Sequence, residues 1–167
     1  DPMSVLDVIR KRRSIRKYEN RDIEQEKLDL IFEAGRLAPS ACNLQNRKFV
    51  FVTDKEKLEK LAHACNHQKF VAEAPAAIVV CSEDSQMISC GQSTAAIDCS
   101  IALSFMILEA TELGLGTCWL GSVDPETVKE VLDLPKDYTV VAVSPLGYPA
   151  EVPAPRPRKS IDQILIR

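Results

Sequence analysis

The sequence Ala76-Ala77-Ile78-Val79-Val80-Cys81 is an unbroken apolar run near the middle of the chain. A strand that is covered on one face alternates apolar and polar residues, whereas a strand that is buried on both faces is apolar throughout. The run therefore predicts a strand that lies inside the protein, with other elements packed on both of its faces.

Helix and strand patterns alternate on either side of this run. We expect further strands at 48–53, 117–121 and 138–143, the last ending at Ser144-Pro145. Helices are predicted from Ser4, over 22–37, after Asp54, over about 93–113, and from Asp124 to Pro135. Strands that are separated by helices form a sheet with helices packed on it, so the class is α/β or α+β.

Size and charge narrow the possible functions. The chain of 167 residues suits one domain, 1–167, and its net charge of -3 argues against a nucleic-acid partner. We see no apolar run that approaches the length of a membrane span, and no secretion signal. We therefore expect a soluble, cytoplasmic protein that contacts neither nucleic acid nor membrane.

The cysteines and histidines do not form a recognisable metal motif. The six cysteines are not arranged as Cys-x-x-Cys, so we expect most of them to be buried and reduced. His63 and His67 lie four residues apart, on one face if the segment is helical, but no third ligand is close in sequence. We expect no metal site.

Residues 10–18 (RKRRSIRKY) contain six cations and the hydroxyl of Ser14. Guanidinium groups bind phosphate oxygens bidentately, and a serine hydroxyl adds a donor without adding charge. A basic helix end exposed to solvent is the alternative, because cations are favoured at helix C-termini without any ligand. A second cation cluster lies in the proline-rich tail, at residues 153–159 (PAPRPRK). The sequence lacks the glycine-rich loops of dinucleotide and P-loop sites, so any phosphate would be bound by cations and a hydroxyl.

Four motifs together give the chain a resemblance to a known family. They are residues 12–18 (RRSIRKY), 38–45 (APSACNLQ), 114–121 (GLGTCWLG), and Gly147-Tyr148-Pro149 followed by Arg158-Lys159. In this order, over residues 4–164, they resemble the nitroreductase family of FMN-dependent NAD(P)H oxidoreductases, in a short form.

The resemblance implies a fold and an assembly. It implies a three-layer α+β protein in which helices flank a mixed central sheet, and a homodimer with FMN at the subunit interface. It also implies that the tail is exchanged between subunits, with residues 160–167 packing on the partner. The long helix over 93–113 would lie in the dimer core; a simple buried helix is the alternative.

The resemblance also implies the residues of the cofactor site. Arg12, Ser14, Arg158 and Lys159 would hold the FMN phosphate with Arg13 nearby, and Arg16 would reach the pyrimidine edge of the flavin. Further flavin contacts would come from two groups of residues. They are Pro39, Ser40, Asn43 and Gln45 of the other subunit, and Asn66, Lys69, Leu120 and Gly121.

The activity implied by the resemblance is carried by the cofactor rather than by a protein nucleophile. Hydride would pass from NADH or NADPH to flavin N5 and then, in a ping-pong cycle, to a small electrophilic acceptor such as a nitroaromatic or quinone. The alternatives are an FMN-binding protein without turnover and a specialised flavin enzyme for dehalogenation or flavin fragmentation.

The chain departs from the family pattern in two ways. Asn46-Arg47 stands where many relatives have Pro-Trp, which leaves the path of the loop uncertain. The chain is also short for the family, which predicts a more open site.

Overall fold

The computed structural model describes residues 2–167, so Asp1 of the expected domain 1–167 lies outside the described residues. Its sheet has the order β1-β2-β4-β3. The strands are β1 (Arg47–Val52), β2 (Ala76–Ser82), β3 (Gly116–Thr117) and β4 (Thr139–Gly147). All three strand pairs are antiparallel, so the expectation of a mixed sheet is wrong. Within the described chain, parallel pairing is confined to an isolated bridge between Ser14 and Thr117.

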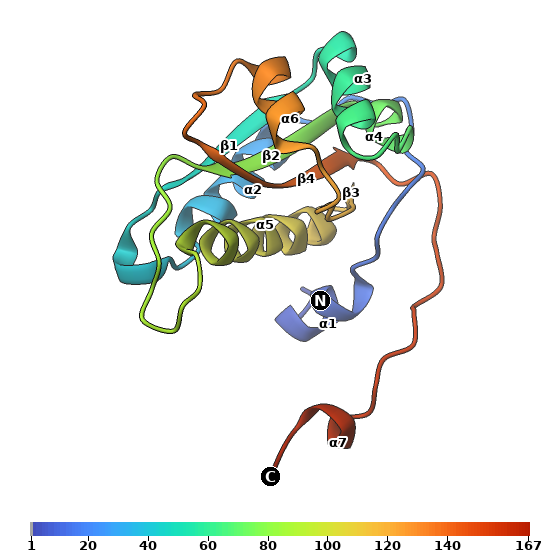
Figure 1. The fold of residues 1–167 in the computed structure, drawn as a ribbon. Coiled ribbons are helices and arrows are strands. Elements are labelled where there is room, and N and C mark those ends of the chain that lie inside the picture. The colour runs from blue at the N-terminus through green and yellow to red at the C-terminus, as the bar shows by residue number, and fades with distance from the viewer. Residues whose placement is uncertain (1) are drawn as a thin grey trace.

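Helices cover both faces of this sheet, which confirms the three-layer α+β class (Figure 1). On one face lie α2 (Gln25–Leu37) and α5 (Thr94–Glu112), and on the other lie α3 (Lys55–Ala64), α4 (Phe70–Glu73) and α6 (Pro125–Leu132). Every residue of β2 is buried, as the apolar run predicts. Ile78 and Val80 face the core under α2 and α5, while Ala77 and Val79 face the core under α3 and α6.

The capping residues explain where several helices begin. Ser4 and Asp7 form a capping box at the start of α1 (Val5–Lys11), and the Asp54 carboxylate accepts the Lys57 N–H at the start of α3. Helix α2 begins at Gln25, later than predicted, and Glu24 precedes it without a side-chain cap. The helix starts expected at Ser4 and Asp54 are thus confirmed, and so are those near Ser93 and at Asp124, where no side chain caps the backbone.

Strands β3 and β4 differ from the prediction. Strand β4 continues through Ser144-Pro145 to Gly147, which corrects the expected end at that dipeptide. The ladder with β3 covers only the last two residues of β4, and the next N–H along, that of Cys118, is donated to Ser144 Oγ instead. Pro145 has no N–H to donate, and it is tolerated in β4 because the ladder with β3 does not extend to this residue. The expected strand 117–121 is reduced to Gly116–Thr117 and a bridge between Leu120 and Val143.

Helix α5 corrects another expectation. By length and composition alone it could cross a membrane, with a mean hydropathy of 1.4 over its most apolar window. In this structure 56% of that window is buried, and Leu103 and Met106 lie fully inside the core. A core helix passes the same test, so packing within this chain accounts for the buried part of α5.

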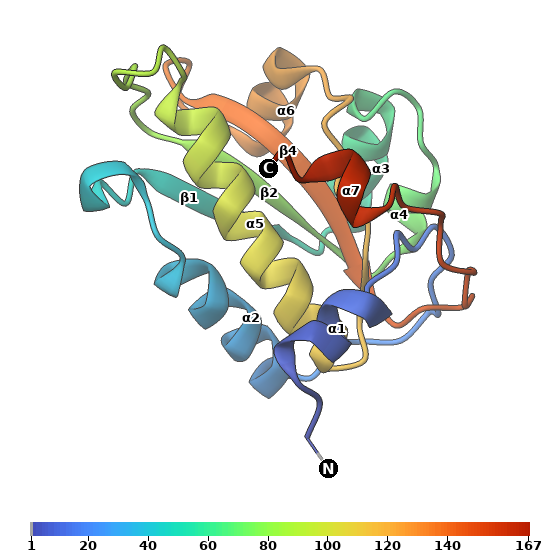
Figure 2. The same cartoon turned by 90° about the horizontal axis from the view of Figure 1, so that it is seen from below.

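The tail after β4 is extended and carries a short helix, α7 (Ile161–Ile164), with its own capping box from Ser160 to Gln163. Figure 1 shows α7 standing clear of the sheet and its helices, and Figure 2 shows the same tail from below. Every residue of α7 is exposed, including Ile161 and Ile164. The tail therefore presents apolar side chains that the rest of this chain does not cover.

Candidate functional site

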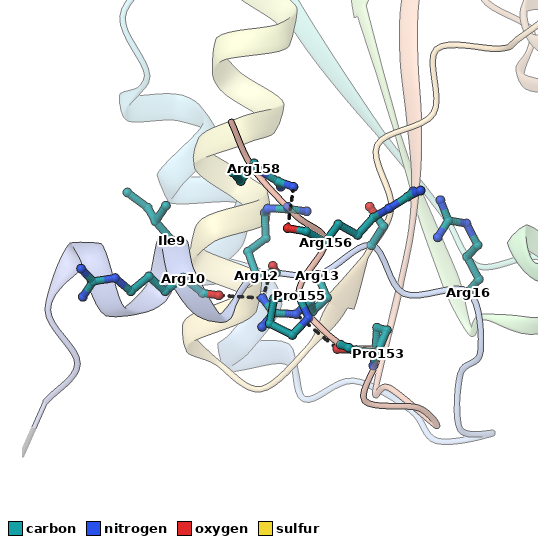
Figure 3. Close-up of a pocket in the computed structure, with 11 residues that line it drawn as sticks. Ile9, Arg10, Arg12, Arg13, Arg16, Pro153, Pro155, Arg156 and Arg158 are labelled. Carbon is teal, nitrogen blue, oxygen red and sulfur yellow. Dashed lines mark hydrogen bonds between the residues drawn. The ribbon is translucent and has the colours of Figure 1, made fainter. Parts of the chain in front are cut away.

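A cavity of about 660 Å³ lies between the C-terminal end of α1 and the extended tail (Figure 3). Six arginines and the hydroxyl-bearing Ser14 line it, and it contains no carboxylate among its lining residues in the described chain. The lining residues come from two distant segments. They are Ile9, Arg10, Arg12, Arg13, Ser14 and Arg16 from the first, and Pro153, Ala154, Pro155, Arg156 and Arg158 from the second.

Arg13 holds these two segments together. Its Nε donates to the Pro153 carbonyl at 3.3 Å, and its Nη1 donates to the Arg10 and Arg12 carbonyls at 2.6 and 2.9 Å. Figure 3 shows this side chain between α1 and the tail. The tail therefore returns to the basic segment, and the hydrogen bonds of Arg13 connect the two.

Backbone contacts continue this attachment along the tail. The Ala150 N–H donates to the Lys17 carbonyl at 2.9 Å, and the Arg16 N–H donates to a carboxylate oxygen of Glu151 at 2.8 Å. The first part of the tail is thus held by hydrogen bonds. Within residues 2–167 the Arg158 side chain bonds to two carbonyls of the tail itself, those of Arg156 and Pro157.

The basic segment is fixed to the sheet by Ile15. Its N–H donates to the Thr117 carbonyl at 2.8 Å, and its side chain is 6% exposed. A Cβ on Gly116 would lie 2.8 Å from Ile15 Cγ1, so the glycine permits this close approach. Burial of Ile15 places its neighbours Ser14 and Arg16 at the cavity.

The cavity has a positive electrostatic environment that also reaches the core beneath it. Burial raises the pKa of the Cys118 thiol, and Arg16, Ser14 and Arg12 oppose this by favouring the thiolate. No side-chain hydrogen bond or ion pair within residues 2–167 engages the Arg12 or Arg16 guanidinium. Guanidinium groups that converge without a carboxylate favour a multiply charged anion such as a phosphate monoester.

The cavity unites five of the fourteen expected cofactor-site residues: Arg12, Arg13, Ser14, Arg16 and Arg158. Lys159 is exposed and does not line it. Asn66 lines a separate hollow of about 390 Å³, together with His63 and His67. The centroids of the two imidazole rings are 4.1 Å apart, and the rings are arranged edge to face. Lys69 precedes α4 as an exposed N-cap residue.

Leu120 and Gly121 lie on the segment that follows β3. Leu120 is buried and bridges to Val143, whereas Gly121 is exposed. A Cβ on Gly121 would lie 2.7 Å from the exposed Trp119 ring, which would have to move aside. The segment can therefore present bare backbone next to an exposed aromatic ring.

The loop with Pro39, Ser40, Asn43 and Gln45 does not join the cavity within one chain. It contains the 3-10 turn η1 (Ala41–Asn43), which Figures 1 and 2 both place well apart from α1. The Ala41 N–H bonds to the Asp98 carboxylate in the first half of α5. This separation is compatible with the expectation that these residues act on a second copy.

Sequence reasoning did not assign Arg10 or Arg156 to the site, although both line the cavity. Arg156 belongs to the cation cluster at residues 153–159, and this cluster could have indicated it as a site residue. Arg47 is buried rather than exposed, at 8% accessibility, and no pattern in the sequence indicated this.

Comparison with known proteins matches most of the chain to the family that the four sequence motifs resemble. The family model described as "Nitroreductase family" matches residues 9–93 and 63–148. A relative from Methanothermobacter thermautotrophicus is 38% identical over 97% of this chain and 86% of its own length. Its name carries a provisional assignment as an NADH dehydrogenase/NAD(P)H nitroreductase.

Two further matches have names that specify a cofactor. The FMN reductase [NAD(P)H] of Bacillus subtilis is 34% identical over 87% of this chain and 66% of its own length. The solved structure of the NADPH:FMN oxidoreductase of Vibrio harveyi, in complex with NAD⁺, aligns with a TM-score of 0.89 and 28% identity. This alignment covers 98% of this chain and 76% of that one.

Proposed function

The chain belongs to the nitroreductase family, and from this premise we propose that it is an NAD(P)H-dependent FMN oxidoreductase in which the arginine-lined cavity holds the FMN phosphate. The observation that carries the proposal is the convergence of Arg12, Arg16 and Arg158 on one cavity without a carboxylate. The names of the relatives, an FMN reductase and an NADPH:FMN oxidoreductase, supply the cofactor class.

The residues present fit a phosphate monoester. Arg12 and Arg158 offer charged donors from the two segments that line the cavity, and Ser14 offers a hydroxyl. Each charge-assisted hydrogen bond contributes about 1.5–3 kcal/mol, so two or three of them give useful affinity for a dianion. Lys159, one residue beyond the cavity lining, adds long-range attraction.

When bound, FMN supplies the hydride chemistry, accepting from NADH or NADPH and donating to an electrophile such as a nitroaromatic or quinone. The protein orients the ring system. Arg16, which lines the cavity, would place a positive charge at the pyrimidine edge, where negative charge collects on reduction. The backbone of Leu120 and Gly121 would lie against the ring, and Asn66 and Lys69 would contact the ring edge.

We further propose that the active form is a cytoplasmic homodimer. Apolar side chains on the surface support it: Val5, Leu6 and Ile9 on α1, Phe105 on α5, and Trp119 are all exposed in the single chain. Residues 160–167 of one copy would cover the other, which would bury Ile161 and Ile164. The loop with Pro39, Ser40, Asn43 and Gln45 would then complete the FMN site of the second copy.

The function is tested by absorbance. Purified protein mixed with FMN and desalted should retain flavin absorbance, and anaerobic addition of NADH or NADPH should bleach it. Retention without bleaching by either nucleotide would identify a non-catalytic FMN-binding protein. A protein that retains no flavin would contradict the site itself.

A further inference from the structure

The loop between α2 and β1 has an unusual backbone. Cys42, Asn43 and Gln45 have φ angles of 51°, 55° and 56°, in the left-handed region. Asparagine tolerates this region, but for other residues it costs about 1–2 kcal/mol each. Such conformations persist only when the surrounding structure imposes them. The loop is therefore held in shape by its neighbours.

Arg47 is the first of these neighbours. It lies directly after the loop and is 8% exposed, and its Nη2 donates to three carbonyls at the end of α2 and the start of the loop. These belong to Gly35, Arg36 and Ala38, at 3.1, 2.9 and 2.6 Å. The carbonyls at a helix C-terminus carry partial negative charge, so a guanidinium is favourable there. Arg47 thus ties the end of the loop to its beginning.

Asp98 holds the middle of the same loop. It is 5% exposed on α5, and its carboxylate accepts the Ala41 N–H at 3.2 and 3.3 Å. Inside the loop, Ser40 Oγ accepts the Gln45 N–H at 3.1 Å. The loop is therefore attached both to the end of α2 and to α5.

Stability alone does not explain a buried arginine at this position. Within residues 2–167, Nη1 of Arg47 is buried with no hydrogen-bond acceptor, and Arg47 forms no ion pair there. Burying a cation without a carboxylate is costly, and an apolar side chain would avoid that cost. A buried charge without a partner of opposite charge is expected where function requires a particular geometry.

We propose that Arg47 is a positioning residue that, together with Asp98, sets the conformation in which the loop presents Ser40, Asn43 and Gln45 to the FMN site of a second copy. Arg47 acts through the loop and does not touch the cofactor. This inference rests on the proposed function, because it takes the loop to be part of an FMN site.

The test compares Arg47→Met with Lys48→Met. The first removes the three bonds to the carbonyls of Gly35, Arg36 and Ala38 at the end of α2. The second removes a neighbouring exposed cation, whose Nζ lies 3.4 Å from a carboxylate oxygen of Glu83. Hydrogen exchange on the FMN-free protein should show faster exchange for R47M, confined to residues 38–46. The FMN Kd, from fluorescence titration, should rise about tenfold in R47M, because small displacements of binding groups are costly. K48M should stay within about twofold of wild type in both measurements.

Two results separate positioning from packing. Partial recovery of FMN affinity in R47K, which keeps the charge without the planar fork, supports the proposal. A lower Tm in R47M with an FMN Kd within about twofold of wild type would overturn it. If R47M does not fold, D98A and R47K carry the same comparison. Wild-type protein that binds no FMN would refute the proposed function, and with it this inference, whereas equal binding by wild type and R47M refutes the inference alone.

Discussion

Replacement of Arg12 by alanine should weaken FMN binding without destabilising the fold. Arg12 lines the cavity, and its side chain makes no hydrogen bond or ion pair within residues 2–167. Its deletion therefore breaks no hydrogen bond or ion pair within residues 2–167, and the free energy of unfolding should change by no more than about 0.5 kcal/mol. The lost contact to a phosphate is worth about 1.5–3 kcal/mol, which corresponds to an FMN Kd higher by about 10- to 150-fold.

The assay is a fluorescence titration of FMN at several salt concentrations. Trp119 provides a second signal, because it is the sole tryptophan of the chain and lines a neighbouring hollow of about 450 Å³ together with Arg12. Lys11→Ala is the matched control, since Lys11 is an exposed neighbour that does not line the cavity. Salt should weaken wild-type binding more steeply than R12A binding, because one screened ionic contact is missing. An FMN Kd for R12A within about twofold of wild type, or an equal loss in K11A, would refute the reasoning.

Two further predictions concern the elements that support the site. Tyr148→Phe should reduce stability near neutral pH: the Tyr148 hydroxyl bond lowers the pKa of Glu24 from 4.5 and raises that of Lys27 from 10.5. A depressed Glu24 pKa stabilises the fold at pH values above 4.5, the ordinary pKa of this group, and this stabilisation is lost as Glu24 becomes protonated. The difference in unfolding free energy between Y148F and wild type should therefore shrink as the pH falls below 4.5. A difference that does not change with pH would contradict this coupling. Gly116→Ala should cost about 1–3 kcal/mol of unfolding free energy by forcing Ile15 aside, and should also raise the FMN Kd; unchanged denaturant midpoints would show that Ile15 moves freely.

The architecture was largely predictable because its signals are local. The apolar run 76–81 required a doubly covered strand, and the capping residues Ser4 and Asp54 marked two helix starts. The continuation of β4 through Pro145 was not predictable, because it depends on how far the neighbouring strand β3 extends. Strand pairing of this kind is a property of the tertiary structure.

The site was predictable only in part for a similar reason. Two basic clusters in the sequence indicated a phosphate cavity, but the separate roles of their arginines depend on side-chain geometry. Arg13 donates to one tail carbonyl, that of Pro153, and to the carbonyls of Arg10 and Arg12, whereas the Arg12 side chain makes no hydrogen bond within residues 2–167. Burial of Arg47 depends on the carbonyls at the end of α2, which come from a different element. The spacing of apolar residues along the sequence does not predict contacts of this kind.

The most direct test of the account is complementation between two defective variants. Each FMN site is proposed to combine the arginine-lined cavity of one copy with the loop of the other. A heterodimer of R12A and N43G, isolated with two different affinity tags, should therefore regain one site of wild-type FMN affinity, because that site uses an intact cavity and an intact loop. The two homodimers should each bind weakly. A heterodimer whose sites all bind as weakly as those of the homodimers, or an N43G homodimer with wild-type affinity, would contradict a site shared between two copies.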